Sequence, residues 1–349
     1  MDFVDPRAAG MDASEVFGLF VQRMETIEVM QRTIAKAMRG GELRTWALNP
    51  VPVDPGSSLA ADDRDFMTEY STATVSTNAR FPIMNAVDCL DAIEELIDWR
   101  PRSRNSHIGS IITLCRTATE SAATTIWLLM SPERAMRRGL SVRFANSETK
   151  PQLRYHASTK KWFAADPARL ESQQYQDFLE HVRLYEKRTA IFRKGERATP
   201  NGKVRGNDDV VRAAAEWIDK HPPPHATGDR GPYGNQGYGF ADVASSFYTV
   251  SSAIVHGLKW PLDYMPNGEL DMSRWIVEGV NVAVGMAECA VALFEAQAQQ
   301  RLPKIKRERY YPRHLAPTIK TWSAEFPVHP RIDSSCLIFD GVADEECAP

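Results

Sequence analysis

The sequence predicts a mainly α-helical bundle, and three observations support this fold class. Apolar residues recur every three or four positions along most of the chain, capping and proline signals separate these stretches, and the alternation typical of strands is scarce. With 349 residues, of which 43% are hydrophobic and 25% charged, the chain can bury a substantial core. We expect the bundle over residues 61–302, preceded by an N-terminal helix and a proline-rich linker (1–60) and followed by an irregular tail, basic and then acidic (303–349).

The N-terminal helix is predicted over residues 14–39, from Ser14 to the Gly40-Gly41 pair. Its seam follows alternating steps of three and four: Phe17, Phe20, Met24, Ile27, Gln31, Ile34 and Met38. Because only about three heptads are present, we expect this seam to pack on its own domain, with a coiled coil as the alternative. The stretch NPVPVDPGSS, residues 49–58, contains three prolines and predicts a linker.

Further helices are expected at 82–99, 106–130, from 131 onward, 167–192, 208–220, 240–256 and 273–301. A long polar insertion is expected at about 193–237, where a basic loop and the glycine-spaced loop GDRGPYGNQGYG occur. The last long helix carries small side chains at a spacing of four, which predicts close approach of another helix: Gly279, Ala283, Ala287 and Val291. Beyond about residue 315, prolines interrupt the chain, so we expect this part to contribute little to the core.

Composition excludes several classes of protein. The net charge of −3 gives no global attraction to nucleic acid or acidic membranes, so binding of either requires a local basic patch. The five cysteines are scattered without a C-x-x-C pair, which argues against a disulfide framework or zinc site and favours the cytoplasm. Charged residues interrupt the most apolar helices, so no membrane span is expected. No metal or cofactor motif is present, and we expect neither group.

The helix at 106–130 contains two charged residues, Arg116 and Glu120, placed four apart in an otherwise apolar sequence. A helix that is apolar all round is a buried helix, and a buried ion pair needs partners. Two interpretations follow. The pair either ties this helix to a neighbour or lines a functional pocket.

The stretch FYTVSSAIVHGLKW, residues 247–260, places Tyr248, Ser252 and His256 one turn apart on one helix face. His256 precedes Gly257, so it is either a core or capping histidine at a helix end or an imidazole for proton transfer or phosphate contact. We expect this helix to pack against the Arg116 helix, because polar groups in a core need partners.

Together the R-x-x-x-E and Y-x-x-x-S-x-x-x-H helices resemble those of poorly characterised bacterial proteins related to the HEPN (higher eukaryotes and prokaryotes nucleotide-binding) superfamily. The resemblance covers about residues 82–302. It implies a HEPN-like bundle acting on or binding RNA or nucleotides in a toxin or phage-defence setting. In that role His256 would be acid or base, Arg116 would stabilise a phosphate and Glu120 would orient Arg116. Ser252, which would hold the imidazole, and Tyr248 complete the five candidate catalytic residues.

Many HEPN proteins are metal-independent ribonucleases that use, at a dimer interface, an Arg that precedes a His with four to six residues between them. This chain has Thr249, Val250 and Ser251 where that Arg would stand before His256. Whether the protein is an enzyme is therefore left open. The alternative function is a catalytically silent helical module that binds a protein partner or itself as a homodimer.

The segment KIKRERYYPRH, residues 304–314, could neutralise phosphates and stack on bases. The candidate nucleic-acid-binding residues in it are Lys304, Lys306, Arg307, Arg309, Tyr310 and Arg313. The alternative is a solvated helix end.

Overall fold

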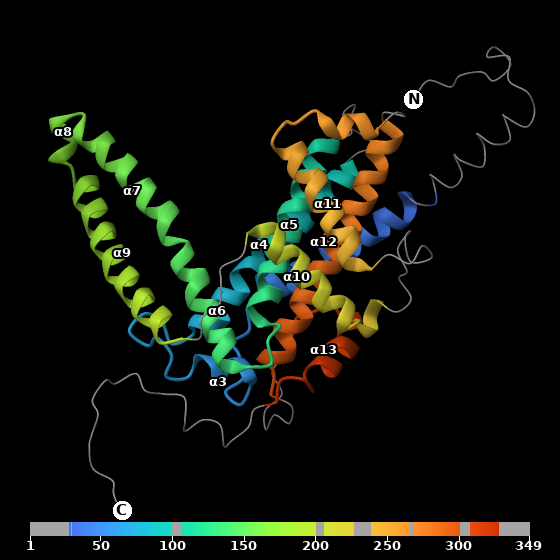
Figure 1. Cartoon of the computed structure of the whole chain (residues 1–349), viewed down its shortest axis with the longest axis horizontal. Helices are drawn as coiled ribbons and strands as arrows, with labels where there is room; N and C mark the ends of the chain where they lie inside the picture. The colour runs from blue at the N-terminus through green and yellow to red at the C-terminus, as the bar shows by residue number, and fades with distance from the viewer. Residues whose placement is uncertain are drawn as a thin grey trace, which may run out of the picture.

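A computed structural model describes residues 28, 30–99, 107–199, 206–226, 239–265, 269–300 and 308–327. These residues are mainly helical and contain no β-strand, which confirms the predicted fold class. Figure 1 shows a helical bundle from one side of which a pair of long helices projects as an arm.

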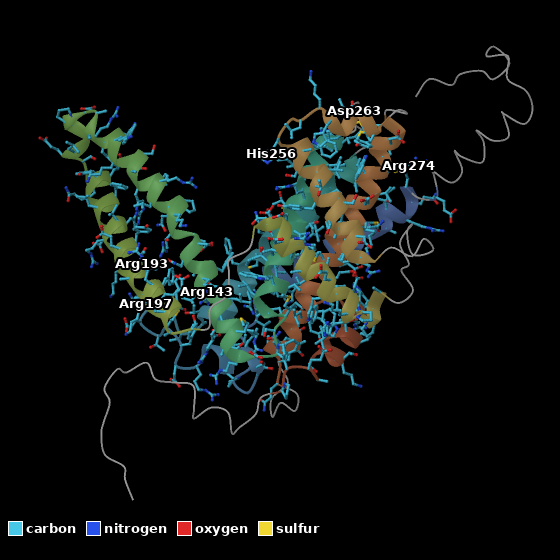
Figure 2. The ribbon with its side chains drawn as sticks, viewed as in Figure 1. Arg143, Arg193, Arg197, His256, Asp263 and Arg274 are labelled. Carbon is cyan, nitrogen blue, oxygen red and sulfur yellow. The ribbon has the colours of Figure 1, made fainter. Side chains whose placement is uncertain are left out.

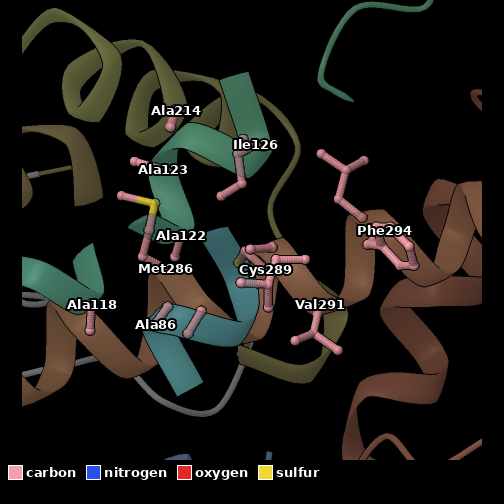
Figure 3. Packing of buried hydrophobic residues seen from close by; sticks show 14 of the residues in the cluster. Ala86, Ala118, Ala122, Ala123, Ile126, Ala214, Met286, Cys289, Val291 and Phe294 are labelled. Carbon is pink, nitrogen blue, oxygen red and sulfur yellow. The ribbon is translucent and has the colours of Figure 1, made fainter. Parts of the chain in front are cut away.

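Three long helices form the centre of the bundle: α4 (Thr74–Trp99), α5 (Ile108–Leu129) and α12 (Glu269–Ala298). Helices α4 and α5 are antiparallel, because Thr125 Oγ1 donates to Ala79 O (2.7 Å) and Asn85 Nδ2 donates to Ser121 Oγ (2.8 Å). Small side chains meet where the three helices pack, including Ala86 of α4, Ala122 of α5 and Cys289 of α12 (Figure 3). The core is thus built on close helix contact.

Gly279 shows how close this contact is. A Cβ atom added there would lie 2.7 Å from the Phe247 ring and 3.2 Å from Cys115 Cβ. The predicted close approach along the small-residue strip of α12 is therefore confirmed at this position. α12 is also long and apolar enough to cross a membrane, but 83% of its most apolar window is buried inside the protein.

Helices α10 (Asn207–Lys220) and α11 (Phe240–Val255) form a second layer on α5. Asp219 at the end of α10 accepts hydrogen bonds from the backbone N–H groups of Phe240 and Ala241 (both 2.9 Å), so one helix caps the next. α10 was expected within a polar insertion, but it packs in the bundle because one of its faces is apolar: Val211, Ala214, Ala215 and Ile218 are buried.

The N-terminal helix is described from residue 30 to residue 41, and the predicted start at Ser14 lies outside the described residues. Its Thr33 and Ala37 are 2% exposed and face the bundle, whereas Ile34 is 41% and Met38 is 56% exposed. The expectation that the Phe17–Met38 seam packs on its own domain is therefore wrong for its described part. Short helices α2 (Arg44–Leu48) and α3 (Ser58–Asp63) follow, and Ser57 caps α3.

The tail is not irregular where it is described. It forms η3 (Arg313–Leu315) and α13 (Ala316–Trp322), and its apolar side chains dock on the bundle: Leu315, Ile319, Trp322 and Phe326 are buried. The Trp322 ring lies edge-on to Trp217, with centroids 4.9 Å apart. The expectation of little contribution beyond residue 315 is therefore wrong, since these four residues follow steps of four, three and four and are all buried.

The arm, defined as residues 149–199, consists of α7 (Thr149–Ala164), α8 (Pro167–Leu170) and α9 (Gln173–Arg197). It leaves the bundle through α6 (Arg134–Ser147), which Arg137 anchors by a bidentate pair with the buried Asp62 (2.6 and 2.8 Å). The long polar insertion was expected at about 193–237, whereas the segment that projects from the bundle is residues 149–199. Two further 3-10 turns, η1 (Pro224–Ala226) and η2 (Trp260–Tyr264), complete the described elements.

Candidate functional site

The middle of α5 and the middle of α11 meet through polar side chains, as predicted. Arg116 Nη2 donates to Tyr248 Oη (3.1 Å), and that hydroxyl donates to Glu120 Oε2 (3.1 Å). Arg116 Nη1 lies 3.4 Å from Glu120 Oε2, and Asn207 at the start of α10 donates to Glu120 Oε1. We call Arg116, Glu120, Asn207 and Tyr248 the Arg116 cluster.

The charges of the Arg116 cluster compensate one another. The guanidinium carbon of Arg116 lies 4.8 Å from the centroid of the Tyr248 ring, so its cation contacts both an aromatic face and a carboxylate. Burial, with the negative charge of Glu120, raises the pKa of Tyr248 to about 12, so this hydroxyl keeps its proton at neutral pH. The side chains of Arg116 and Glu120 are 17% and 27% exposed, which leaves little of the positive charge for a phosphate.

His256 does not belong to this cluster. It is exposed at the C-cap of α11, where its backbone N–H donates to Ser252 O (3.1 Å) and Gly257 follows with φ of +67°. Eight residues separate it from Tyr248, a distance of about 12 Å along the helix axis. Among the described residues, no hydrogen bond or ion pair joins its side chain to Arg116 or Glu120. Figure 2 shows His256 at the end of the bundle.

The five candidate catalytic residues are thus split. The structure brings Arg116, Glu120 and Tyr248 together, places Ser252 half-buried one turn beyond Tyr248, and places His256 one turn further, at the surface. The single-site interpretation that combined His256 with Arg116 and Glu120 is not supported by this geometry. The capping interpretation of His256 fits its position.

The candidate nucleic-acid-binding residues of the basic segment 304–314 do not form one surface among the described residues. Lys304, Lys306 and Arg307 lie outside the described residues. The Arg309 side chain is 8% exposed and pairs with Asp54 (2.8 Å) and Glu295 (3.3 Å), so its charge is already bound to two carboxylates. Tyr310 Oη donates to Glu308 Oε2 (3.4 Å), and Arg313 is exposed at the start of η3. Arg309 therefore holds the chain against the bundle and presents no free charge to a nucleic acid.

Sequence analysis missed a second polar cluster, around Glu288 of α12. Arg39 of the N-terminal helix donates to both carboxylate oxygens (2.5 and 2.8 Å), and His314 Nε2 lies 2.8 Å from Oε1. His225 Nε2 and Lys36 Nζ lie 3.5 and 3.7 Å from Oε2. We call these five residues the Glu288 cluster. The signal was present, since Glu288 interrupts an apolar helix, but its partners lie far away in the sequence.

The Glu288 cluster holds a fully buried carboxylate in its charged form. Burial alone would raise the pKa of Glu288, but the hydrogen bonds from His225 and His314 and the charges of Lys36 and Arg39 outweigh burial and hold that pKa well below its usual range. The side chain of His225 is itself 1% exposed, and its Nδ1 lies 2.8 Å from Thr318 Oγ1. Within the described parts of the chain no group of His, Cys, Asp and Glu could hold a metal ion. The cluster therefore joins segments that lie far apart in the sequence.

The arm differs from both clusters in charge and exposure. Residues 149–199 contain 11 Lys and Arg against 6 Asp and Glu, a net charge of +5, whereas the rest of the chain has 31 against 39, a net charge of −8. A groove of about 850 Å³ runs between α7 and α9. Its lining combines aromatic and basic side chains, among them Tyr155, Phe163, Phe178, His181, Lys187 and Arg188.

Exposed aromatic rings add to the arm surface. Tyr155 is 66% and Trp162 is 51% exposed, and the Arg169 guanidinium lies 4.2 Å from the centroid of the Trp162 ring. Exposed aromatic and cationic side chains side by side are typical of surfaces that bind nucleic acid.

Comparison with known proteins adds no relative: no protein-family model, curated protein or solved structure matches this chain.

Proposed function

We propose that the protein binds single-stranded nucleic acid, RNA in particular, along its arm, and that it does not cleave it. The observation that carries this proposal is the separation of charge, because the arm is net positive in a protein that is net negative elsewhere. A local positive surface attracts phosphates even when the whole protein is acidic.

The basic residues of α9 form a stripe. Arg183, Lys187, Lys194 and Arg197 follow one another at steps of four, seven and three, which places them on one face of the helix over about 21 Å. Arg193 lies beside this stripe, and Figure 2 shows Arg193 and Arg197 near the base of the arm.

Three members of this surface, Lys187, Arg193 and Arg197, form no ion pair with any described residue. By contrast, Arg183 binds Glu180, and Lys194 lies 3.5 Å from Glu69. We therefore assign phosphate contact to the three unpaired cations and base stacking to the exposed rings of Tyr155 and Trp162.

The choice of RNA, and of a toxin or phage-defence setting, follows the resemblance of α5 and α11 to HEPN proteins. The geometry of the Arg116 cluster supports binding without cleavage. A metal-independent ribonuclease needs an imidazole and a free cation at the same phosphate. Here the Arg116 cation faces Glu120, and His256 lies at the far end of α11.

The test is fluorescence anisotropy of a short labelled oligouridine with the full-length protein at several salt concentrations. The variant Lys187→Glu with Arg193→Glu and Arg197→Glu should weaken binding about tenfold or more. It should also reduce the slope of log K against log salt by about 2, because each single-strand phosphate contact contributes about 0.7.

The matched control reverses three exposed cations of the bundle: Arg44, Arg212 and Lys259. It changes the net charge equally and should retain the wild-type slope. Equal loss in both variants, or no binding by the wild type at low salt, would refute the proposal. Cleavage of the oligonucleotide that disappears in His256→Ala would refute the statement that the protein does not cleave RNA.

A further inference from the structure

Two polar side chains of the arm groove have buried nitrogen atoms without a hydrogen-bond partner among the described residues. His156 of α7 lines the groove and is 7% exposed, and its Nδ1 is one of these atoms. Arg188 of α9 lines the groove from the other helix, and its Nε is the second. Buried polar atoms are normally hydrogen-bonded, and each exception requires an explanation. Two exceptions in one groove indicate a site that a ligand completes.

Gln152 joins these two residues into one polar surface. It lies one turn before His156 on α7, and its Oε1 accepts a hydrogen bond from Arg188 Nη2. This hydrogen bond fixes the orientation of the Gln152 amide, so the two N–H groups of its Nε2 have no partner in the described part of the chain. We call Gln152, His156 and Arg188 the groove cluster.

Aromatic rings surround the groove cluster. The His156 ring is held edge-on by Tyr185 and Phe178, with centroids 4.9 and 5.8 Å away. Tyr155, which is 66% exposed, lies beside it at a centroid distance of 6.1 Å. The groove volume of about 850 Å³ falls within the range of about 300–1,000 Å³ of small-ligand sites. A planar ring that stacks on Tyr155 can therefore direct its polar edge toward the groove cluster.

The charge of the groove favours a neutral ring over a phosphate. Its lining contains two cations and two carboxylates: Lys187, Arg188, Glu69 and Asp177. Burial, with the charges of Arg188 and His181, lowers the pKa of His156, so its imidazole is neutral at neutral pH. The phosphates of a bound strand would instead contact the basic surface of α9, which continues beyond the groove at Arg193 and Arg197.

We propose that the groove holds one guanine base of a bound strand, a site that rests on the nucleic-acid binding proposed for the arm. Guanine presents two adjacent acceptors, N7 and O6, on one edge, and arginine is the commonest specific partner of this edge. Arg188 and Gln152 offer it their unused N–H donors. Adenine has an N6 amino donor in place of O6, which would face these same donors. Uracil has no two adjacent acceptors.

The test compares three labelled strands by fluorescence anisotropy with the full-length protein: an oligouridine, and the same strand with one guanosine or one adenosine at its centre. The guanosine strand should bind about tenfold more tightly than the adenosine strand, because a pair of hydrogen bonds to a base edge gives discrimination of this order. Both purines stack, so the comparison isolates the polar edge. Equal affinity for the two strands would overturn the proposal.

Matched substitutions test whether the groove cluster makes this distinction. Arg188→Met keeps the aliphatic stem and removes the donors, so the preference for guanosine should be lost. Lys187→Met removes the same charge from the neighbouring groove residue, and it should weaken all three strands equally and keep the preference. His156→Phe keeps a ring between Tyr185 and Phe178 and should also reduce the preference. Circular dichroism checks that each variant retains the wild-type helix content, and a preference that survives Arg188→Met and His156→Phe would refute the assignment.

The oligouridine separates failure of the guanine site from failure of the proposed function. If all three strands bind equally and Lys187→Glu with Arg193→Glu and Arg197→Glu weakens them, the guanine site is refuted and nucleic-acid binding by the arm stands. If none of the strands binds, nucleic-acid binding by the arm is refuted, and the guanine site with it.

Discussion

Helices α12 and α9 are of similar length, 30 and 25 residues, but they stand in opposite environments. Every residue from Met286 to Ala298 of α12 is buried, whereas α9 buries five residues along its whole length. The carboxylates of α12 are paired inside the bundle, and the charges of α9 face solvent. Most of the buried area that stabilises the fold therefore lies in the bundle, whereas the arm is mainly solvent-exposed surface.

The largest effect expected from this comparison is in the bundle, for Glu288→Gln. Loss of the buried charge leaves Arg39 and Lys36 without their carboxylate, and breaking such a pair costs about 3 kcal/mol of unfolding free energy. Urea unfolding followed by circular dichroism measures it. Glu42→Gln is the matched control, because Glu42 also lies near His314 (3.8 Å) but its side chain is 61% exposed, and it should cost about 1 kcal/mol or less. Equal losses would mean that burial does not set the strength of these pairs.

The same Glu288→Gln variant tests how the charge of Glu288 makes the stability of the protein depend on pH. The pKa of Glu288 is lower in the folded protein than its usual value of 4.5, so its contribution is present above that value and is lost as pH falls below it. The stability difference between wild type and Glu288→Gln should therefore shrink as pH decreases below about 4.5. A difference that stays constant would contradict the low pKa.

A smaller loss is expected for Gly279→Ala, which places a methyl group 2.7 Å from the Phe247 ring. Overpacking of this kind costs about 1 to 3 kcal/mol, because α11 or the ring must shift. Gly109→Ala on α5 is the control, since no atom lies within 4 Å of its added Cβ, and it should be neutral or slightly stabilising. Thermal unfolding compares the two, and a neutral Gly279→Ala would mean that Phe247 is free to move.

Tyr248→Phe should lower the free energy of unfolding by less than Gly279→Ala does, by about 1 kcal/mol. It removes one hydroxyl that links Arg116 to Glu120. The measurement is urea unfolding, with Tyr155→Phe on the exposed arm as control. If the Arg116 cluster is structural, nucleic-acid binding by Tyr248→Phe stays at the wild-type level. A loss of binding without a loss of stability would place the cluster in a functional site after all.

The smallest effect is expected on the arm, for Leu153→Ala. This side chain is 56% exposed, so its truncation should change the unfolding free energy by less than about 0.5 kcal/mol. Leu90→Ala in α4, which is 1% exposed, should cost about 2 to 5 kcal/mol. A large loss for Leu153→Ala would show that the surface of the arm is covered in solution.

The helices that could be predicted from the sequence are those whose ends are marked by residues close to them in the chain. The ends of α10 and α11 were predicted to within one residue, because apolar periodicity and the prolines and glycines around them mark both helices. The start of α4 was placed at Pro82, eight residues late, because its N-terminus is capped from a distance. Asp63 accepts hydrogen bonds from the backbone N–H groups of Val75 and Ser76 (2.7 and 3.2 Å), a contact that the residues near Thr74 do not reveal.

The candidate site was predictable to the same extent. Arg116, Glu120 and Tyr248 meet because each interrupts an apolar helix face, and such residues must find each other. His256 shares that face by spacing, but the helix ends there, so periodicity alone placed it too deep. Docking of Trp322 was missed because prolines interrupt this segment. The helical signal was present, since the buried apolar residues follow steps of four, three and four: Leu315, Ile319, Trp322 and Phe326.

The Glu288 cluster also limits the order in which the chain can fold during synthesis. Arg39 precedes Glu288 by 249 residues, and His314 follows it by 26. Until residue 314 leaves the ribosome, α12 carries a carboxylate that lacks part of its neutralising shell, and α13 cannot cover the bundle. The N-terminal helix therefore cannot dock on α12 until most of the chain has been translated, and the face of α4 that α12 covers stays accessible to chaperones for that period.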